Sequence, residues 1–248
     1  MEKIILDKLV EIEKQSSVKI LYACESGSRA WGFASPDSDY DVRFIYVHPI
    51  DYYLTIDEQR DVIELPINDL LDINGWELRK ALRLLRKANA PLYEWLQSPI
   101  VYQMEEMFLA ELREQMNTYF SSRAMMHHYV SMTKNVLDNE LSSEQVQLKK
   151  YFYALRPVLA SLWIAKHNET PPMEFGILRR MLDPELDSII NDLLTQKKKV
   201  DEKFMINVIP QLNDWIKAQV DFCEKNVPDR GPKLDSISLN EIFRRYTK

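Results

Sequence analysis

The sequence predicts an α+β fold in which a small mixed β-sheet domain is followed by an all-helical domain. Strand-like runs, rich in β-branched and aromatic residues, are confined to the first part of the 248 residues. Long helical patterns fill the remainder, where only Gly176 and Gly231 of the five glycines lie. We therefore expect a sheet domain at residues 1–105 and a helical domain at residues 106–248.

The sheet domain is expected to begin with a helix and to continue with three strands. Residues 3–15 place Ile5, Leu9 and Ile12 on one side of a helix, which is an amphipathic spacing. Short apolar runs bounded by proline or turn residues indicate strands. The expected strands are residues 18–24, 40–47 and 61–65.

The segment that follows the strands predicts mostly helix. Residues 70–75, "LLDING", fit either the end of a strand or the approach to a helix. Residues 76–88 carry a leucine stripe on one helical face and Arg79, Arg83 and Arg86 on another. A short helix is expected in "PLYEWLQSP". In the helical domain we expect helices at residues 103–118, 120–138, 143–167, 174–181, 184–198 and 202–225.

Composition limits the class of protein. A net charge of −6 and a pI of about 5.4 argue against a dedicated nucleic-acid coat or a membrane-surface protein, although a local basic face would suffice for a nucleic-acid substrate. Cys24 and Cys223 form no CxxC pair, which argues against thiolate zinc, and we expect Cys24 to be a buried strand residue. The first residues do not resemble a signal peptide, and no apolar run is long enough to span a membrane, so we expect a cytoplasmic protein.

Two aspartates at the second expected strand indicate a metal site. Asp39 and Asp41 are spaced i, i+2, which places both carboxylates on one face of a strand. Neighbouring carboxylates repel each other, so the arrangement is costly without a cation. Mg²⁺ prefers carboxylate and phosphate oxygens, and two such ions about 4 Å apart clamp the reacting oxygens of a phosphoryl transfer. We expect two Mg²⁺ ions here, with Mn²⁺ as a substitute.

A glycine-serine turn before these aspartates suits a phosphate group. Gly27 and Ser28 follow the first expected strand and precede an expected helical turn. Glycine lets backbone N–H groups approach a phosphate, a helix start adds its positive end, and the Ser28 hydroxyl can donate a hydrogen bond. Gly32 would let the chain turn back toward the aspartates.

These residues carry a resemblance to a known family. The sequence "GSRAWG…SDYDVRFIYV" resembles the signature of the DNA polymerase β nucleotidyltransferase superfamily, which has a Gly-Ser, a spacer and then Asp-hydrophobic-Asp on a strand. "DINGWELRKALRLLRKANAPLYEWLQSPIVY" extends the likeness to the bacterial nucleotidyltransferases named for an RNA-repair pathway. "KKYFYALRPVLASLWI" and "PPMEF" are similar to the helical portion of that group, so the resemblance covers most of the chain.

The resemblance implies both a fold and a reaction. A small polymerase β-like sheet domain would carry the metals, and a helical domain would close over the nucleotide. A nucleoside monophosphate would pass from an NTP to an acceptor hydroxyl, with release of pyrophosphate. Gly27 and Ser28 would bind the triphosphate, while Asp39 and Asp41 would ligate the metals.

The superfamily also uses a third carboxylate, as a metal ligand and general base. Asp72 lies just before "INGWELRK", where related sequences hold an acid, and we favour it as the third catalytic and metal-binding residue. Glu64, on the strand expected at residues 61–65, is the rival. Glu77 lies on an expected helix and is equally well explained as a solvated residue.

Basic residues must offset the charge of a triphosphate. Arg29 is adjacent to the expected phosphate turn, and Lys80 lies in the helix after Asp72, so both are candidate NTP contacts. The arginine stripe of that helix either tracks a polynucleotide backbone or is a solvated face. Lys149 and Arg156 lie two helical turns apart on one side of a helix, where they either close on the nucleotide or form structural salt bridges.

The leading interpretation is a magnesium-dependent nucleotidyltransferase that uses an NTP and modifies RNA, a protein or a small molecule such as an aminoglycoside. A toxin–antitoxin type that modifies a protein partner stays open within this class. Two other classes also stay open: a non-catalytic nucleotide-binding module of the same fold, and an interaction module formed by residues 105–248. Three converging carboxylates would favour catalysis, whereas two carboxylates with a distant third would favour binding alone.

Overall fold

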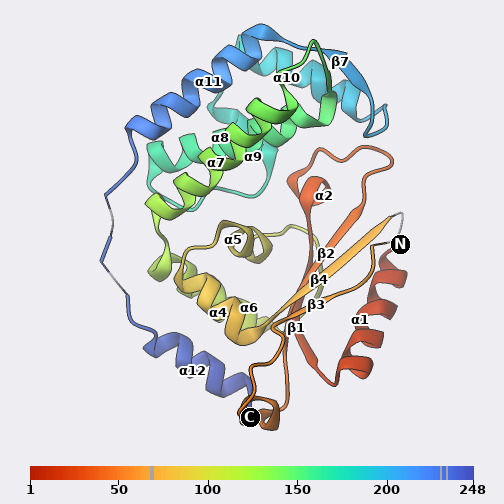
Figure 1. The fold of residues 1–248 in the computed structure, drawn as a ribbon, viewed down its shortest axis with the longest axis vertical. Coiled ribbons are helices and arrows are strands. Elements are labelled where there is room, and N and C mark those ends of the chain that lie inside the picture. The colour runs from red at the N-terminus through yellow and green to blue at the C-terminus, as the bar shows by residue number, and fades with distance from the viewer. Residues whose placement is uncertain (68–69, 230, 233) are drawn as a thin grey trace. The chain divides into compact units, whose positions relative to one another are not determined.

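The computed structural model describes residues 1–67, 70–229, 231–232 and 234–248 (Figure 1). The chain packs as two compact units, and each is built from separate segments. The first, here called the sheet unit, comprises Met1–Gly27, Asp39–Phe120 and Pro232–Lys248. The second, here called the helical unit, comprises Ser28–Ser38 and Ser121–Gly231.

The sheet unit contains a five-stranded mixed sheet with the strand order β3-β4-β2-β1-β5. Strands β2 and β4 are parallel, and the other neighbouring pairs are antiparallel. The strands are β1 (Lys19–Ser26), β2 (Tyr40–Val47), β3 (Val62–Glu64), β4 (Leu71–Glu77) and β5 (Val101–Met104). The helices are α1 (Glu2–Ser16), α3 (Ile50–Tyr53), α4 (Leu78–Arg86), α5 (Ala90–Leu96), α6 (Glu106–Tyr119) and α12 (Ile237–Tyr246).

One face of the sheet forms the core beneath α1. Ile5, Leu9 and Ile12 of α1 are buried against alternate residues of the strands, as their helical spacing predicts. The strand residues in this core include Val42 and Phe44 of β2, together with Tyr46, Leu71 and Ile73. Because strand side chains alternate between faces, the intervening residues of β2 and β4 lie on the opposite face.

Helices of the sheet unit cover part of that opposite face. Helices α4, α5 and α6 lie on this side (Figure 1), and Trp76 of β4 stacks on Trp95 of α5 with ring centroids 3.8 Å apart. Asp41 and Arg43 of β2 and Asp72 of β4 lie on the same face but at the amino-terminal ends of their strands, where they are partly exposed. The sheet therefore presents a charged patch beside a packed aromatic region.

The helical unit is built on α7 and α8, with α11 packed against both. Phe33, from the segment between β1 and β2, is fully buried in this unit, 5.2 Å from Phe152 and 5.5 Å from Phe175 between ring centroids. The elements are α2 (Gly27–Trp31), which joins the two units, α7 (Ser122–Glu140), β6 (Gln145–Gln147), α8 (Leu148–His167), α9 (Phe175–Leu178), a 3₁₀ turn η1 (Arg179–Met181), α10 (Pro184–Lys197), β7 (Met205–Asn207) and α11 (Pro210–Lys225).

The α+β fold class predicted from the sequence is confirmed, with differences in particular elements. Of the open segment 70–75, all but its first residue lies in β4, and the helix expected at 103–118 begins later because β5 extends to Met104. The helices expected at 143–167 and 202–225 each begin later, because β6 and β7 pair as a short two-stranded sheet within the helical unit. The domain boundary near residue 105 stays a prediction, since compact packing does not show which segments fold independently.

Candidate active site on the sheet

Asp41 and Asp72 are neighbours across the parallel pair of strands. The register of β2 and β4 sets Asp41 opposite Asp72. Paired residues of a parallel ladder project to the same face, so the two carboxylates lie side by side. Each side chain keeps 28% of its surface exposed, which leaves both within reach of solvent and of a ligand.

A single arginine bridges the two carboxylates. Arg43 follows Asp41 by two residues, so it lies on the same face of β2. Its Nη2 donates to Asp72 Oδ2 at 2.7 Å and to Asp41 Oδ1 at 3.0 Å. Arg43 is only 17% exposed. The pair of acids is therefore held together by the positive charge of this guanidinium.

Gly27 is fitted against Asp41. Its φ of +60° lies in the left-handed region, which glycine adopts without strain. A Cβ at this position would lie 2.0 Å from Asp41 Oδ2, far inside van der Waals contact. Only glycine lets the Asp41 carboxylate lie directly against the backbone at the end of β1. The sequence singled out Gly27 for a phosphate, and the structure shows that it also makes room for a carboxylate.

Glu25 is a site residue that the sequence analysis did not identify. It is fully buried on β1, and its Oε1 accepts a hydrogen bond from the backbone N–H of Asp41 at 2.8 Å. Its Oε2 accepts from the hydroxyl of Tyr102 on β5. These bonds fix the start of β2, where Asp41 lies. An acidic residue inside the apolar run "KILYACES" is the signal for such a role, because a buried carboxylate requires partners.

Asp39 lies just outside the strand ladder that pairs Asp41 with Asp72. It is exposed and precedes the first residue of β2 by one position. Over the residues that the structure describes, no three His, Cys, Asp or Glu side chains gather closely enough to hold a metal ion. Asp41 and Asp72 are thus brought together, while the convergence of Asp39 with them stays a prediction.

The residues present nevertheless fit a hard divalent cation. Two carboxylates lie side by side on one sheet face, and each keeps 28% of its surface exposed. Carboxylate oxygens are the ligands that Mg²⁺ prefers. The bridging arginine shows that the pair is stabilised by a positive charge, which a metal ion supplies more strongly.

The two rival acids have other partners. Glu64 lies opposite Asn74 at the edge of the sheet, and its carboxylate accepts from Asn74 Nδ2 at 3.0 Å and from Arg60 at 3.1 Å. Glu77 is buried and accepts from the backbone N–H of Arg79 at 2.8 Å, as the N-cap of α4. The structure thus places Asp72, rather than either of these residues, next to Asp41.

Three of the predicted basic contacts have partners within their own units. Lys80 pairs with Asp61 at 2.9 Å in the sheet unit. In the helical unit, Arg29 donates to the carbonyl of Ser38 at 2.6 Å, and Lys149 pairs with Glu202 at 2.8 Å. The roles of these residues in nucleotide binding stay predictions.

Arg156 and Ser28 are the most enclosed of the predicted contacts. Arg156 is 2% exposed, donates from Nε to the carbonyl of Met173 at 3.1 Å and lies 4.6 Å from the ring centroid of Trp31. Ser28 is 4% exposed within α2. The stacked and hydrogen-bonded state of Arg156 gives it a structural role within the helical unit. Its predicted part in nucleotide binding is untested.

The arginine stripe of α4 lines an open groove within the sheet unit. Arg79 lies 5.0 Å from the ring centroid of Tyr53 and 5.1 Å from that of Phe243 on α12. Arg86 donates to the hydroxyl of Ser236. The groove between α4 and α12 has a volume of about 420 Å³ and is lined by Arg79, Leu82, Arg83, Arg86, Ser236, Leu239, Asn240 and Phe243.

The cysteine prediction is confirmed for Cys24, which is fully buried on β1. Burial raises the pKa of its thiol to about 12, which keeps it protonated and poorly nucleophilic near neutral pH. In the described part of the chain, no helix is long and apolar enough to cross a membrane.

Comparisons with known proteins identify the family. Residues 1–245 match the family RlaP, described as the RNA repair pathway DNA polymerase beta family, and the chain belongs to that family. It is therefore a member of a polymerase β-like nucleotidyltransferase family, as its Gly-Ser and Asp-Tyr-Asp sequences predicted.

Two individual proteins are similar over most of their length. The protein YcgL of Bacillus subtilis (strain 168), which is named as uncharacterized, is 47% identical over 223 residues, covering 89% of this chain and 86% of the relative. A solved nucleotidyltransferase-like protein from Exiguobacterium sibiricum 255-15 is 14% identical and covers 98% of this chain and 79% of that one. Its TM-score is 0.32.

Proposed function

We propose that this protein is a magnesium-dependent nucleotidyltransferase, which transfers a nucleoside monophosphate from an NTP to an acceptor hydroxyl and releases pyrophosphate. The observation that carries the proposal is the side-by-side placement of Asp41 and Asp72, with the Asp41 carboxylate against Gly27. Membership of a polymerase β-like family supports the same reaction. Asp39, Asp41 and Asp72 are the proposed metal ligands.

The chain's own residues would act by holding charge and geometry. Asp41 and Asp72 supply oxygen ligands from two adjacent strands, whose ladder fixes their separation. Bound Mg²⁺ ions would neutralise the phosphates and stabilise the charge that develops on the oxygens of the displacement. Asp72 is also the candidate base that accepts the proton of the acceptor hydroxyl. Gly27 would leave its backbone accessible to a phosphate oxygen.

RNA is the acceptor that we favour, and the α4 arginines support this choice. Arg83 is exposed on α4 and lines the groove next to α12, as Arg79 and Arg86 also do. Aromatic rings at Tyr53 and Phe243 lie in the same region. Arginines interleaved with aromatic rings suit the backbone and bases of a single strand. A protein side chain or a small molecule would not require such a groove.

The direct test is incubation with each α-³²P-labelled NTP and Mg²⁺ or Mn²⁺, against separated RNA, protein and metabolite fractions of a cell extract. We expect label in the RNA fraction, and none with the Asp41→Asn variant. Label in protein or in a small molecule would keep the reaction and overturn the acceptor. No labelled product in any fraction, despite NTP binding, would contradict nucleotidyl transfer.

A second candidate function is nucleotide binding without catalysis. It is favoured by one observation, namely that no three metal-ligating side chains converge among the described residues. The two functions differ in the fate of the α-phosphate. A non-catalytic module would bind NTP and metal and would leave the nucleotide intact over many hours.

A further inference from the structure

We infer that Arg43 is an internal counter-ion that competes with the metal for Asp41 and Asp72, so that a divalent cation binds by displacing this guanidinium. The inference rests on the proposed function, because it concerns the same carboxylates. It assigns a role to a residue outside the Gly-Ser and Asp-Tyr-Asp sequences. Arg43 is a positioning residue here, since it acts on the metal ligands.

The contacts of Arg43 divide between side chains and backbone. Nη2 donates to the carboxylates of Asp41 and Asp72, at 3.0 and 2.7 Å. Nη1 donates to the backbone carbonyls of Asp72 and Val42, at 3.0 and 3.1 Å. Only the Nη2 contacts compete with a cation for the same oxygens. The Nη1 contacts hold the arginine at the site after the carboxylates exchange it for a metal ion.

Charge explains why the exchange favours the metal. The guanidinium carries a single positive charge, and a divalent cation brings two to the same carboxylate oxygens. A guanidinium and a metal ion on the same oxygens would repel each other, so the two cations exclude one another. The side chains are partly buried, which limits the screening of these interactions by water.

The type of residue at position 43 matters as well as its charge. A guanidinium presents a planar fork, so one end can serve two carboxylates while the other holds backbone carbonyls. A lysine ammonium is a compact point charge and would serve the carboxylates without the same backbone anchors. Without either cation, two carboxylates would face each other across adjacent strands, where like charges are destabilising.

The test is Mn²⁺ binding to the metal-free protein without nucleotide, measured through the EPR signal of the free Mn²⁺. Four variants are compared with the wild type: Arg43→Gln, Arg43→Lys, Asp41→Asn and, as a matched control, Arg60→Gln. Arg60 pairs with Glu64 at 3.1 Å in the same unit, so its removal frees a carboxylate elsewhere. Thermal unfolding of each variant with and without Mn²⁺ reports whether each variant is folded.

We expect Arg43→Gln to bind Mn²⁺ about tenfold more tightly than wild type, which corresponds to about 1.4 kcal/mol. Its unfolding temperature should be lower than that of wild type without metal and should rise more when Mn²⁺ is added. The Mn²⁺ affinity of Arg43→Lys should lie between those of wild type and Arg43→Gln. This variant provides the same comparison if Arg43→Gln does not fold. Arg60→Gln should bind as wild type does, and Asp41→Asn should lose the site.

The opposite results separate the inference from the proposed function. One outcome is that wild type binds Mn²⁺, Asp41→Asn does not, and neither Arg43 variant binds more tightly than wild type. This outcome would overturn the inference and leave the metal site standing. Absence of Mn²⁺ binding by wild type would overturn the metal-dependent function and the inference together. Tighter binding by Arg60→Gln alone would assign the metal to Glu64 and overturn the inference.

Discussion

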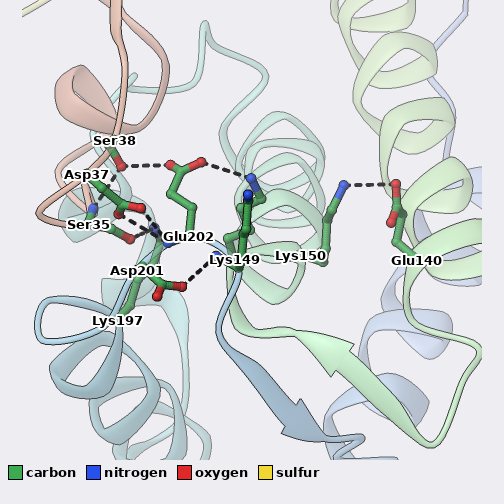
Figure 2. Close-up of polar contacts among 10 residues, drawn as sticks. Ser35, Asp37, Ser38, Glu140, Lys149, Lys150, Lys197, Asp201 and Glu202 are labelled. Atoms are coloured by element: carbon green, nitrogen blue, oxygen red, sulfur yellow. Dashed lines mark hydrogen bonds and ion pairs between the residues drawn. The ribbon is translucent and has the colours of Figure 1, made fainter. Parts of the chain in front are cut away.

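Two charged clusters, one in each unit, show how similar residues serve different purposes. On the sheet, Asp41 and Asp72 share one cation, Arg43, and each carboxylate keeps 28% of its surface exposed. In the helical unit, Lys149 and Glu202 form an ion pair at 2.8 Å beside the segment Ser28–Ser38 (Figure 2). In the first cluster two partly exposed carboxylates share a guanidinium, and in the second an acid and a base form a pair.

The helical cluster ties the segment before β2 to the helices. Ser38 donates to Glu202 Oε1 at 2.8 Å, and the buried Lys197 donates to Ser35 Oγ at 2.6 Å. Burial lowers the pKa of Lys197 by disfavouring its charged form. The carboxylate of Asp37 accepts from the backbone N–H of Glu202 at 3.1 Å. The polar groups of this cluster have partners within it, so we interpret the cluster as having a structural role.

The comparison teaches that charge balance and exposure separate a binding site from a structural cluster more reliably than the presence of charged residues. We expect the sheet cluster to gain from a divalent cation, because such an ion brings more charge to Asp41 and Asp72 than the guanidinium of Arg43 does. In the helical cluster, Lys149 pairs with Glu202, Lys197 donates to a hydroxyl and Asp37 accepts from a backbone N–H, so we expect a smaller gain there. Changes in the first should alter catalysis, and changes in the second should alter stability.

The largest expected effect is a loss of nucleotidyl transfer, and it compares two carboxylates of the sheet unit, Asp72 and Glu64. Asp72→Asn should lower nucleotidyl transfer by about 10³-fold or more, because a metal ligand and the candidate base are lost together. Glu64→Gln is the matched control, and it should keep activity within about twofold of wild type. Steady-state rates with labelled NTP measure both. A large loss in Glu64→Gln with a small loss in Asp72→Asn would reverse the assignment of the third carboxylate.

The next effect tests how closely the sheet site is fitted. Gly27→Ala should lower activity about 100-fold, because the new Cβ would displace the Asp41 carboxylate, which lies 2.0 Å away. It should also lower the free energy of unfolding by about 1–3 kcal/mol, since φ is +60°. Denaturant unfolding and rate measurements check the two results. The control is Gly176→Ala, where the new Cβ has no neighbour within 4 Å, and wild-type behaviour of Gly27→Ala would refute the fit.

A smaller effect concerns the buried support of the site. Glu25→Gln should lower the free energy of unfolding by about 1–3 kcal/mol, because the amide replaces an acceptor that serves both Asp41 N–H and the Tyr102 hydroxyl. It should also weaken Mn²⁺ binding, since Asp41 lies at the strand start that Glu25 holds. Tyr102→Phe removes one of these bonds and should have a lesser effect on both. Equal metal binding by Glu25→Gln and wild type would limit Glu25 to a structural role.

The smallest effect belongs to the helical cluster and appears as a pH dependence. Burial alone would raise the pKa of Glu202, but hydrogen bonds from Lys149 and Ser38 hold it below the ordinary value of 4.5. The resulting stability is present above pH 4.5 and is lost as the pH falls through the lowered pKa. In Glu202→Gln, the free energy of unfolding should therefore fall by about 1 kcal/mol less than in wild type below pH 4.5. Nucleotidyl transfer at neutral pH should be retained. Thermal unfolding of the variant and of wild type from pH 3 to pH 7 tests this. The same loss of stability in acid for both proteins would contradict the structural role of the cluster.

Sequence patterns predicted the fold class well because they record local preferences. The alternation of residues in β2 and the spacing of Ile5, Leu9 and Ile12 follow from burial on one face. The short strands β6 and β7 were not predicted, because each has three residues and depends on its partner. Helix α12 was also missed, although Phe243 lies beside Arg79 and Tyr53 in the sheet unit.

The candidate site was predictable as residue types and less so as an arrangement. Asp41 and Asp72 were named from the sequence, but their contact depends on the parallel register of two strands separated by a long connection. Glu25 and Arg43 were missed because their importance lies in what they contact across strands. The membership of Ser28–Ser38 in the helical unit was equally hidden, since it depends on the burial of Phe33 among distant aromatic residues.

The most direct test of the metal site is a crystal of the protein grown with Mn²⁺ and a non-hydrolysable NTP analogue, examined by anomalous scattering. The account predicts a manganese peak within about 2.0–2.2 Å of carboxylate oxygens of both Asp41 and Asp72, with the Arg43 Nη2 contacts broken. A bound nucleotide with no manganese at these carboxylates, and with Arg43 still bridging them, would contradict it.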